Sequence, residues 1–377
     1  MKPIQMVDLK GQYQKIKDQV DASILNVIEN TAFINGPEVK EFQKEMEDYL
    51  GVKHVIPCAN GTDALQIAMM ALGLELGDEV ITADFTFAAT VEVIALLKLT
   101  PVLVDVEKDT FNIDIEALKK AITPKTKAII PVHLFGQCSN MEAVLKVAKA
   151  HNLFVIEDTA QAIGADYTFA DGTSKKAGTM GDVGTTSFFP SKNLGCYGDG
   201  GAIFTNDDDL AHLLRGIINH GMVSERYYHD IVGVNSRLDS IQAAVLRIKL
   251  PHLDRYCNAR LKVAEYYNDA FANTPKLSTP ITSSFTTHVF HQYTLVLNGV
   301  DRAALQKHLS DKNIASAIYY PVPLHNQKAY ADTRYNEADF TITNELCKTV
   351  MSLPIHTEFE EDQLKYITES VLSFVNS

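Results

Sequence analysis

Short apolar runs alternate with helical stretches between residues 54 and 156, and this alternation limits the possible folds more than any other feature of the sequence. The apolar runs are His54–Cys58, Glu79–Ala83, Val102–Val106, Ala128–Val132 and Phe154–Ile156. The stretches with apolar residues at helical spacing are Ala64–Leu72, Ala88–Leu97, Ile115–Ile122 and Met141–Ala150. Repeated strand and helix units build a largely parallel sheet with helices on both faces, so the sequence predicts an α/β fold.

Later patterns predict where a large domain ends. The runs Thr185–Phe189 and Ala202–Thr205 lie too close together for a helical crossover, so we expect them to add an antiparallel element to the sheet. A helical pattern over Leu238–Leu250 then meets Pro251, which favours a helix end. We therefore place a large domain over residues 1–250.

The segment that follows predicts a smaller α+β domain over residues 251–377, entered through a connecting helix that runs to about Phe271. Its expected elements are strand Gln292–Leu297, helix Ala303–Leu309, strand Ala315–Tyr320, and helices near Ile342–Val350 and Asp362–Phe374. In the large domain, Tyr167–Gly178 is expected to form a surface hairpin of unknown role, with Asp171-Gly172 at its turn.

Charge and cysteine content exclude several classes of protein. The chain has 34 Lys and Arg against 47 Asp and Glu, a net charge of -13, and this argues against nucleic acid or anionic lipid as a partner. We find no signal-peptide pattern and no apolar stretch of about 20 residues, so we expect a soluble cytoplasmic protein. The five cysteines are scattered without a C-x-x-C pair, and neither a disulfide framework nor a zinc site is expected.

Asn60-Gly61-Thr62-Asp63, between an expected strand and an expected helix, is a candidate anion site. Free backbone amides at a helix start bind phosphate, Gly61 allows close approach, and Thr62 adds a hydroxyl donor. An ordinary helix cap explains the same residues, because Thr and Asp are standard capping residues.

Two further motifs could take part in catalysis. Glu157-Asp158 ends an apolar run where open α/β sheets place their ligands, and a carboxylate there can hold a cationic ring nitrogen, bind a metal or cap a helix. Lys192 lies between the aromatic run Ser187–Pro190 and the glycine-rich segment Gly195–Gly201. Such packing can desolvate the amine and lower its pKa towards the nucleophilic range, although most lysines are solvated surface residues.

Together the three motifs match what pyridoxal phosphate needs from a protein. The cofactor takes a phosphate cup, a carboxylate that keeps its ring nitrogen protonated, and an amine that bonds to its aldehyde. A protein that only binds phosphate would need the first of these alone.

The sequence resembles the DegT/StrS-type nucleotide-sugar aminotransferases of the aspartate aminotransferase superfamily (fold type I), from Asp8-Leu9 almost to the C-terminus. The matching stretches are Asn60–Leu65, Asp78–Ala83, Phe85–Thr90, Glu157–Gly164, Ser187–Gly195, Gly198–Phe204, Gly233–Asp239 and Tyr320–His325. Several ordered blocks are far more specific than any single one.

The resemblance implies roles around the cofactor. Lys192 would bond to pyridoxal phosphate and move the proton during transfer, and Asp158 would pair with the pyridine nitrogen. Gln161 would face the phenolic oxygen, and Phe87 would cover the ring unless it is simply a core aromatic. The implied phosphate donors are Gly61, Thr62 and Ser187.

The resemblance also implies a homodimer with shared sites. Asn235 would reach the phosphate of the neighbouring subunit. The apolar helix Leu238–Leu250 could form the interface or belong to the core, and the sequence leaves both open.

Substrate contacts are expected at Arg237, Tyr319, Tyr320 and His325. Arg237 could bind an anionic group of the substrate or could be a surface or salt-bridged residue. The Pro321–His325 pattern resembles the loop of relatives that aminate the 3-position of a sugar, but those relatives usually carry histidine where Tyr319 stands. A dTDP-linked 3-keto-6-deoxy sugar and a UDP-linked 3-oxo-uronate both stay open.

The resemblance therefore predicts an aminotransferase that moves an amino group from glutamate to a keto group of a nucleotide-diphosphate sugar, in the biosynthesis of surface polysaccharide or glycan precursors. One alternative is a pyridoxal-phosphate-dependent dehydratase, which the presence of Lys192 and the absence of iron–sulfur cysteine spacing disfavour. Another is a non-catalytic regulator on the same scaffold. No metal is expected.

Overall fold

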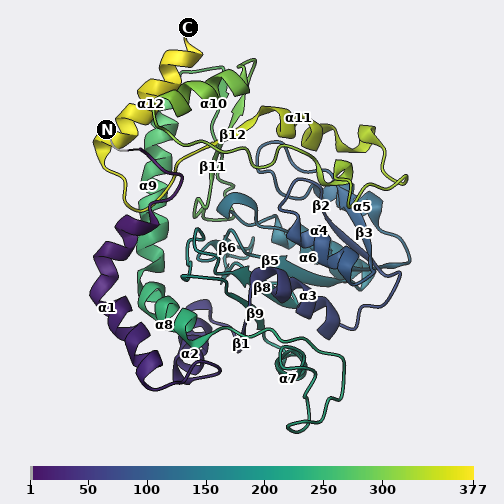
Figure 1. The fold of residues 1–377 in the computed structure, drawn as a ribbon. Helices are drawn as coiled ribbons and strands as arrows, with labels where there is room; N and C mark the ends of the chain where they lie inside the picture. Colours follow the sequence, from purple (N-terminus) through teal and green to yellow (C-terminus); the bar gives the residue numbers. More distant parts are fainter. Residues whose placement is uncertain (1–2) are drawn as a thin grey trace.

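A seven-stranded mixed sheet forms the centre of the protein in the computed structural model, which describes residues 3–377 (Figure 1). The strand order is β1-β9-β8-β5-β4-β2-β3. The strands are β1 His54–Cys58, β2 Glu79–Ala83, β3 Thr100–Val104, β4 Thr126–Ile130, β5 Phe154–Asp158, β8 Val183–Ser187 and β9 Gly201–Thr205. Strands β3, β2, β4, β5 and β8 are parallel, while β9 pairs antiparallel with both β8 and β1. The predicted α/β fold and its antiparallel addition are confirmed.

Alternate residues of the central strands pack against helices on opposite faces, as the two-residue period of a strand requires. Ile129 and Val155 join the apolar cluster of α5 (Ile115–Ala121) and α6 (Met141–His151). Their neighbours Ile130 and Ile156 join the cluster on the other face. That cluster includes residues of helices α3 Gly61–Ala71, α4 Ala89–Leu96 and α7 Asp208–Ile217.

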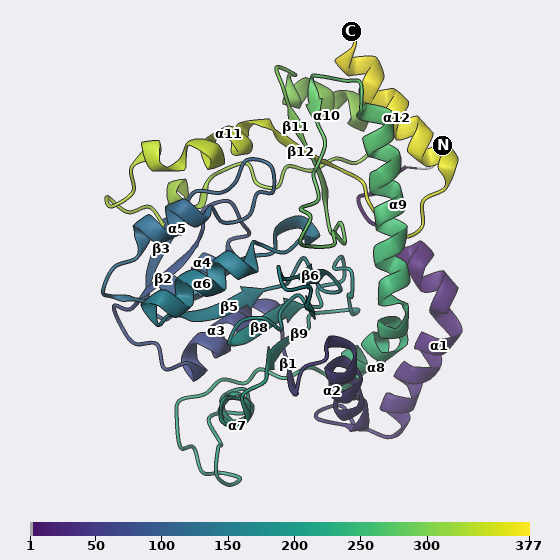
Figure 2. The ribbon, with the colours of Figure 1, turned by 180° about the vertical axis from the view of Figure 1, so that it is seen from behind.

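Further helices lie along one side of the molecule, where both ribbon views place them (Figures 1 and 2). They are α1 Leu9–Glu29, α2 Pro37–Leu50, α8 Ser240–Lys249 and α9 Leu253–Phe271. Helix α2 begins with Pro37 and is followed by Gly51 at φ 65°, a backbone conformation that glycine adopts at little cost. Helix α8 passes through a short turn at Pro251 into α9, which leads to the C-terminal part of the chain.

The C-terminal part is built on an antiparallel sheet of β10 (Leu277–Ser278), β11 (Tyr293–Leu297) and β12 (Val350–Leu353). Its helices are α10 Arg302–Asp311, α11 Thr341–Thr349 and α12 Glu361–Val375. One apolar cluster joins this sheet to α9, α10 and α12, in keeping with the expected α+β arrangement. The division of the chain into domains at residue 250 stays a prediction.

One prediction in this part was wrong, and one strand was not predicted. Residues 315–320 were expected as a strand, but within the described chain they make one isolated bridge, from Ala317 to Ser352. The last two residues of this run, Tyr319 and Tyr320, line a cavity instead of pairing with a strand. Strand β12 was missed because the apolar pattern of α11 continues without a break into Val350.

The expected hairpin is present as β6 (Asp166–Thr168) and β7 (Ser174–Lys176), paired antiparallel, with Gly172 at φ 85° between them. None of the helices within residues 3–377 is both long and apolar enough to cross a membrane.

Candidate active site

A cavity of about 800 Å³ lies where strands β5 and β8 end and helix α3 begins. Open α/β sheets place ligands at this edge. The structure brings the following predicted cofactor residues together on its wall: Gly61, Thr62, Phe87, Asp158, Gln161, Ser187 and Lys192.

One end of the cavity suits an anion. Asn60, rather than Thr62 or Asp63, caps α3, because its side chain accepts a hydrogen bond from the backbone N–H of Asp63 at 2.8 Å. The amides of Gly61 and Thr62 precede the first intrahelical bond and are available to a ligand. A Cβ on Gly61 would lie 2.7 Å from the Cβ of Ser187, so only glycine lets helix and strand approach this closely.

A buried carboxylate lies on the wall of the same cavity. Asp158 ends β5 and is 6% exposed. Its Oδ2 accepts a hydrogen bond from the Thr90 hydroxyl at 2.9 Å, and its Oδ1 accepts one from the Ala160 backbone at 3.1 Å. Each carboxylate oxygen thus accepts one hydrogen bond and has room to accept a further one, as from a ring N–H.

Lys192, which carries the candidate amine, lies in the loop between β8 and β9. Part of the residue reaches the cavity surface, yet burial of the amine lowers its pKa to about 8, against an opposing effect of Asp158. The loop is held firmly: Lys249 Nζ donates to the carbonyl of Gly195 at 2.7 Å, and Asn193 Nδ2 donates to the carbonyl of Val289 at 2.9 Å. The site therefore presents an amine that loses its proton readily and whose backbone is fixed.

Gln161 joins the cofactor wall to the predicted substrate loop. Its Oε1 accepts from the Phe135 backbone at 2.8 Å, and its Nε2 donates to the Tyr320 hydroxyl at 3.1 Å. The ring of Phe87 is 58% exposed at the cavity and lies 6.4 Å from the Tyr320 ring. The specific roles predicted for Gln161 and Phe87 stay predictions.

Three predicted residues lie off the cavity wall of this chain: Asn235, Arg237 and His325. Asn235 bridges to Asn219, whose side chain lies 3.5 Å from Arg237 Nη1. His325 is buried against Asp84, with 2.6 Å between His325 Nδ1 and Asp84 Oδ2. His325 therefore anchors its loop to Asp84, and the substrate contact expected of it stays a prediction.

His291 also lines the cavity, and the sequence analysis missed it. Burial holds the pKa of its imidazole well below the usual range, and the positive charges of Lys192 and Arg260 add to this effect. Arg260 Nη1 donates to the carbonyls of Phe290, His291 and Ile355 and so fixes this segment. No local sequence motif predicts that His291 lies at the site, because contacts between residues far apart in the sequence place it there.

The residues present fit pyridoxal phosphate: a glycine-lined helix start for the phosphate, a buried carboxylate for the ring nitrogen and a desolvated amine line the same cavity. Among residues 3–377, no group of three or more His, Cys, Asp or Glu side chains could hold a metal ion. Fold and site together define a pyridoxal-phosphate-dependent enzyme of the aminotransferase class.

Comparison with known proteins gives the family. The profile of the DegT/DnrJ/EryC1/StrS aminotransferase family matches residues 14–372, and the chain belongs to this family. It is 45% identical, over 97% of its length and 98% of the relative's, to the UDP-2-acetamido-2-deoxy-3-oxo-D-glucuronate aminotransferase of Pseudomonas aeruginosa.

Two other relatives differ in what their names say. The chain is 44% identical, over 98% of both chains, to a protein of Geobacillus stearothermophilus called "Pleiotropic regulatory protein". The crystal structure of S. venezuelae DesV in complex with a ketimine intermediate superposes with a TM-score of 0.95, at 36% identity over all of both chains.

Proposed function

We propose that this protein is a pyridoxal-phosphate-dependent aminotransferase that moves an amino group from glutamate to the 3-keto group of a nucleotide-diphosphate sugar. The observation that carries the proposal is the placement of the Lys192 amine, whose pKa burial lowers to about 8, in one cavity with Asp158 and the start of α3. The names of the P. aeruginosa relative and of the family support the reaction class and the 3-oxo sugar.

Each residue has a physical task in this reaction. The amides of Gly61 and Thr62 and the hydroxyl of Ser187 would bind the phosphate, and the Asp158 carboxylate would accept a hydrogen bond from the protonated ring nitrogen. Bound pyridoxal phosphate supplies a conjugated electron sink and the carbonyl that takes up the amino group. Lys192 Nζ would hold the cofactor at that carbonyl carbon, with loss of water, and as a free amine it would take the proton from the donor's α-carbon.

The proposed substrate contacts come from two tyrosines of the cavity and from one arginine. Tyr319 and Tyr320 line the cavity and would contact the sugar. A UDP-linked 3-oxo-uronate would need a cation for its carboxylate, and Arg237 of a neighbouring subunit is the proposed partner. A dTDP-linked 3-keto-6-deoxy sugar would need none, and the neutral hydroxyl of Tyr319 suits it.

We also propose that the active form is a homodimer in which Asn235 of each chain completes the site of the other. A cytoplasmic location and a role in making polysaccharide or glycan precursors belong to the same proposal.

The test of the reaction is a half-reaction without sugar. Purified protein loaded with pyridoxal phosphate should absorb in the visible, glutamate should bleach that band with release of 2-oxoglutarate, and Lys192→Ala should lack the band. A band that is the same in the variant would remove Lys192 from its role. Glutamate turnover then calls for a panel of 3-keto and 4-keto nucleotide sugars, and exclusive use of a 4-keto sugar would overturn the 3-position.

The same assay addresses the other candidate functions. The name of the G. stearothermophilus relative favours a regulator on this scaffold, and a regulator would not turn over glutamate. A dehydratase would consume a sugar without accumulating 2-oxoglutarate.

A further inference from the structure

A histidine and a carboxylate are buried behind the cavity, and the proposed reaction uses neither of them. Glu157 precedes Asp158 on β5, and successive side chains of a strand point to opposite faces, so Glu157 points away from the wall that Asp158 lines. Glu157 and His133 are both fully buried, and 3.0 Å separates His133 Nε2 from Glu157 Oε2.

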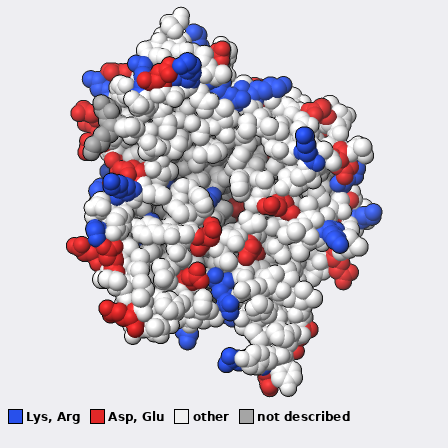
Figure 3. Space-filling model, viewed as in Figure 1, with Lys and Arg blue, Asp and Glu red and all other residues white. Residues whose placement is uncertain are grey.

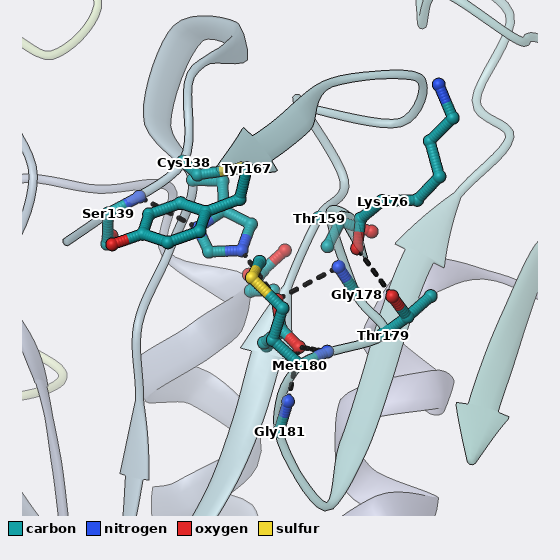
Figure 4. Close-up of polar contacts among 12 residues, drawn as sticks. Cys138, Ser139, Thr159, Tyr167, Lys176, Gly178, Thr179, Met180 and Gly181 are labelled. Carbon is teal, nitrogen blue, oxygen red and sulfur yellow. Dashed lines mark hydrogen bonds and ion pairs between the residues drawn. The ribbon is translucent and has the colours of Figure 1, made fainter. Parts of the chain in front are cut away.

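Backbone amides of the loop after β7 complete the surroundings of the Glu157 carboxylate; Figure 4 labels the three residues that supply them, Gly178, Met180 and Gly181. Gly178 N–H donates to Oε2 at 2.9 Å, while Met180 and Gly181 N–H each donate to Oε1 at 2.6 Å. With His133, four donors converge on the two oxygens, and each of these hydrogen bonds within residues 3–377 has Glu157 as the acceptor. This set matches an ionised carboxylate, which accepts only.

The hydrogen bonds of His133 also fix its tautomer. Its Nδ1 accepts from the Ser139 backbone N–H at 3.1 Å, so the ring proton is on Nε2, which donates to Glu157. The imidazole is therefore neutral. Within the described part of the chain, the hydrogen-bond donors to the buried Glu157 carboxylate are all neutral dipoles.

His133 holds both residues of the Glu157-Asp158 pair. Its ring binds Glu157, and its backbone N–H donates to the carbonyl of Asp158 at 3.0 Å. From the same adjoining segment, the carbonyl of Pro131 accepts from the Asp158 N–H at 3.0 Å. The backbone of Asp158 is thus tied on both sides to the segment that follows β4.

We propose that His133 and Glu157 form a positioning pair that fixes Asp158 and thereby sets how tightly the cofactor ring is held; this rests on the proposed function. The pair also gives the hairpin β6–β7 a role. The loop that follows β7 supplies the amides of Gly178, Met180 and Gly181, which bind Glu157. The hairpin therefore stabilises the end of β5, where Asp158 lies.

Two substitutions of His133 test whether it positions Glu157 through its hydrogen bond or only fills space in the core. In His133→Gln the side-chain amide nitrogen reaches the place of Nε2 and can still donate to Glu157. In His133→Asn the shorter amide reaches only the place of Nδ1, so it can serve Ser139 but leaves Glu157 without its side-chain donor. Thr294→Val is the control for destabilisation, because it removes a buried hydrogen bond to Ser352 in the C-terminal sheet.

The experiment titrates each cofactor-free protein with pyridoxal phosphate and follows the visible absorption, alongside thermal unfolding. We expect His133→Asn to raise the dissociation constant about tenfold, the equivalent of one hydrogen bond to a buried charge, and His133→Gln to stay within about twofold of wild type. The absorption maximum should shift in His133→Asn alone. Equal constants and spectra in both variants, or a loss no larger than that of Thr294→Val, would overturn the proposal.

A measurement on the wild-type protein covers the case in which His133→Asn does not fold. Binding of pyridoxal phosphate should slow hydrogen exchange at the amides of Gly178, Met180 and Gly181, but not at those of β11. Unchanged exchange at these three amides would refute the coupling. Wild-type protein that binds no pyridoxal phosphate would instead defeat the proposed function itself.

Discussion

The amine of Lys192 makes the stability of the cofactor-free protein depend on pH. Its pKa is lowered from 10.5 to about 8, so between these values the unfolded chain binds more protons than the native one. Stability must therefore rise with pH across this window. Lys192→Met lacks the ionisable group and should lose this contribution. We predict that, in urea unfolding at pH 8, 9 and 10, wild type gains stability relative to Lys192→Met.

Lys249 also has a lowered pKa, of about 8, but it is common to both proteins and cancels in the difference. Parallel stability curves for wild type and Lys192→Met would mean that the Lys192 amine is solvated in the native state.

Gly61 predicts a steric effect at the phosphate end. A Cβ there would lie 2.7 Å from the Cβ of Ser187 and 3.1 Å from its Cα, so Gly61→Ala must push α3 away from β8. Overpacking of this kind costs about 1–3 kcal/mol, and we expect weaker binding of pyridoxal phosphate as well as lower stability. Adding Ser187→Gly removes the nearest atom and should restore much of the stability.

The measurement is a double-mutant cycle of unfolding free energies over Gly61→Ala and Ser187→Gly. Additive effects of the two substitutions would contradict the crowding, because then the new methyl group would not press on Ser187.

The predictability of the site differs from residue to residue. Asp158 and Lys192 could be proposed from the sequence because each ends or follows an apolar run beside distinctive neighbours. His291 could not, since nothing near it in the sequence tells that it faces Lys192 across the fold. For His325 the motif indicated the loop, but the contact between its side chain and Asp84 could not be predicted, because the two residues lie far apart in the sequence.

At the scale of elements, the loop that carries Tyr319 and Tyr320 is tied to the end of β2. The Asp84 carboxylate, just after β2, accepts from the His325 backbone at 2.8 Å and binds His325 Nδ1, and the His325 ring stacks on Phe340 at 4.2 Å. Breaking a buried pair leaves one partner without compensation.

We predict that Asp84→Ala lowers the free energy of unfolding by about 3 kcal/mol and raises KM for the sugar, while the affinity for pyridoxal phosphate stays near that of wild type. Asp84→Asn is the matched control, because its amide oxygen can still accept from the His325 backbone, and it should lose clearly less. Urea unfolding and steady-state kinetics measure both effects. An unaltered KM in Asp84→Ala would separate this anchor from substrate binding.

The sequence predicted elements well where one pattern had one explanation. The runs at His54–Cys58 and Glu79–Ala83 are strands with the predicted bounds, and both are flanked by helices. Residues 315–320 carry the same apolar signal but form no strand, and the last two, Tyr319 and Tyr320, line the cavity; no local pattern distinguishes this use from a strand. Whether such a run becomes a strand or lines a cavity depends on whether a strand elsewhere in the chain pairs with it.

Across the molecule as a whole, acidic and basic side chains are interspersed over the face in Figure 3, and the net charge of the chain is -13. Apolar side chains are exposed elsewhere. The segment after α7 projects from the body in Figure 1 and carries Tyr227, Tyr228 and Val232 at 73%, 63% and 84% exposure. Asn235 follows closely in the sequence. Exposed apolar clusters of this kind mark interaction surfaces, and a second copy of the chain is the occupant we propose.

Mixed dimers test this arrangement directly. If Asn235 completes the site of the partner, a dimer of one Lys192→Ala chain and one Asn235→Asp chain contains one site with both defects and one with none. Each homodimer has a defect in both sites, because Asp at 235 would repel the phosphate. After subunit exchange at equal amounts, half of the dimers are mixed, so we predict recovery of about a quarter of wild-type activity. If Asn235 served its own chain, every site would carry a defect, and mixing would restore nothing.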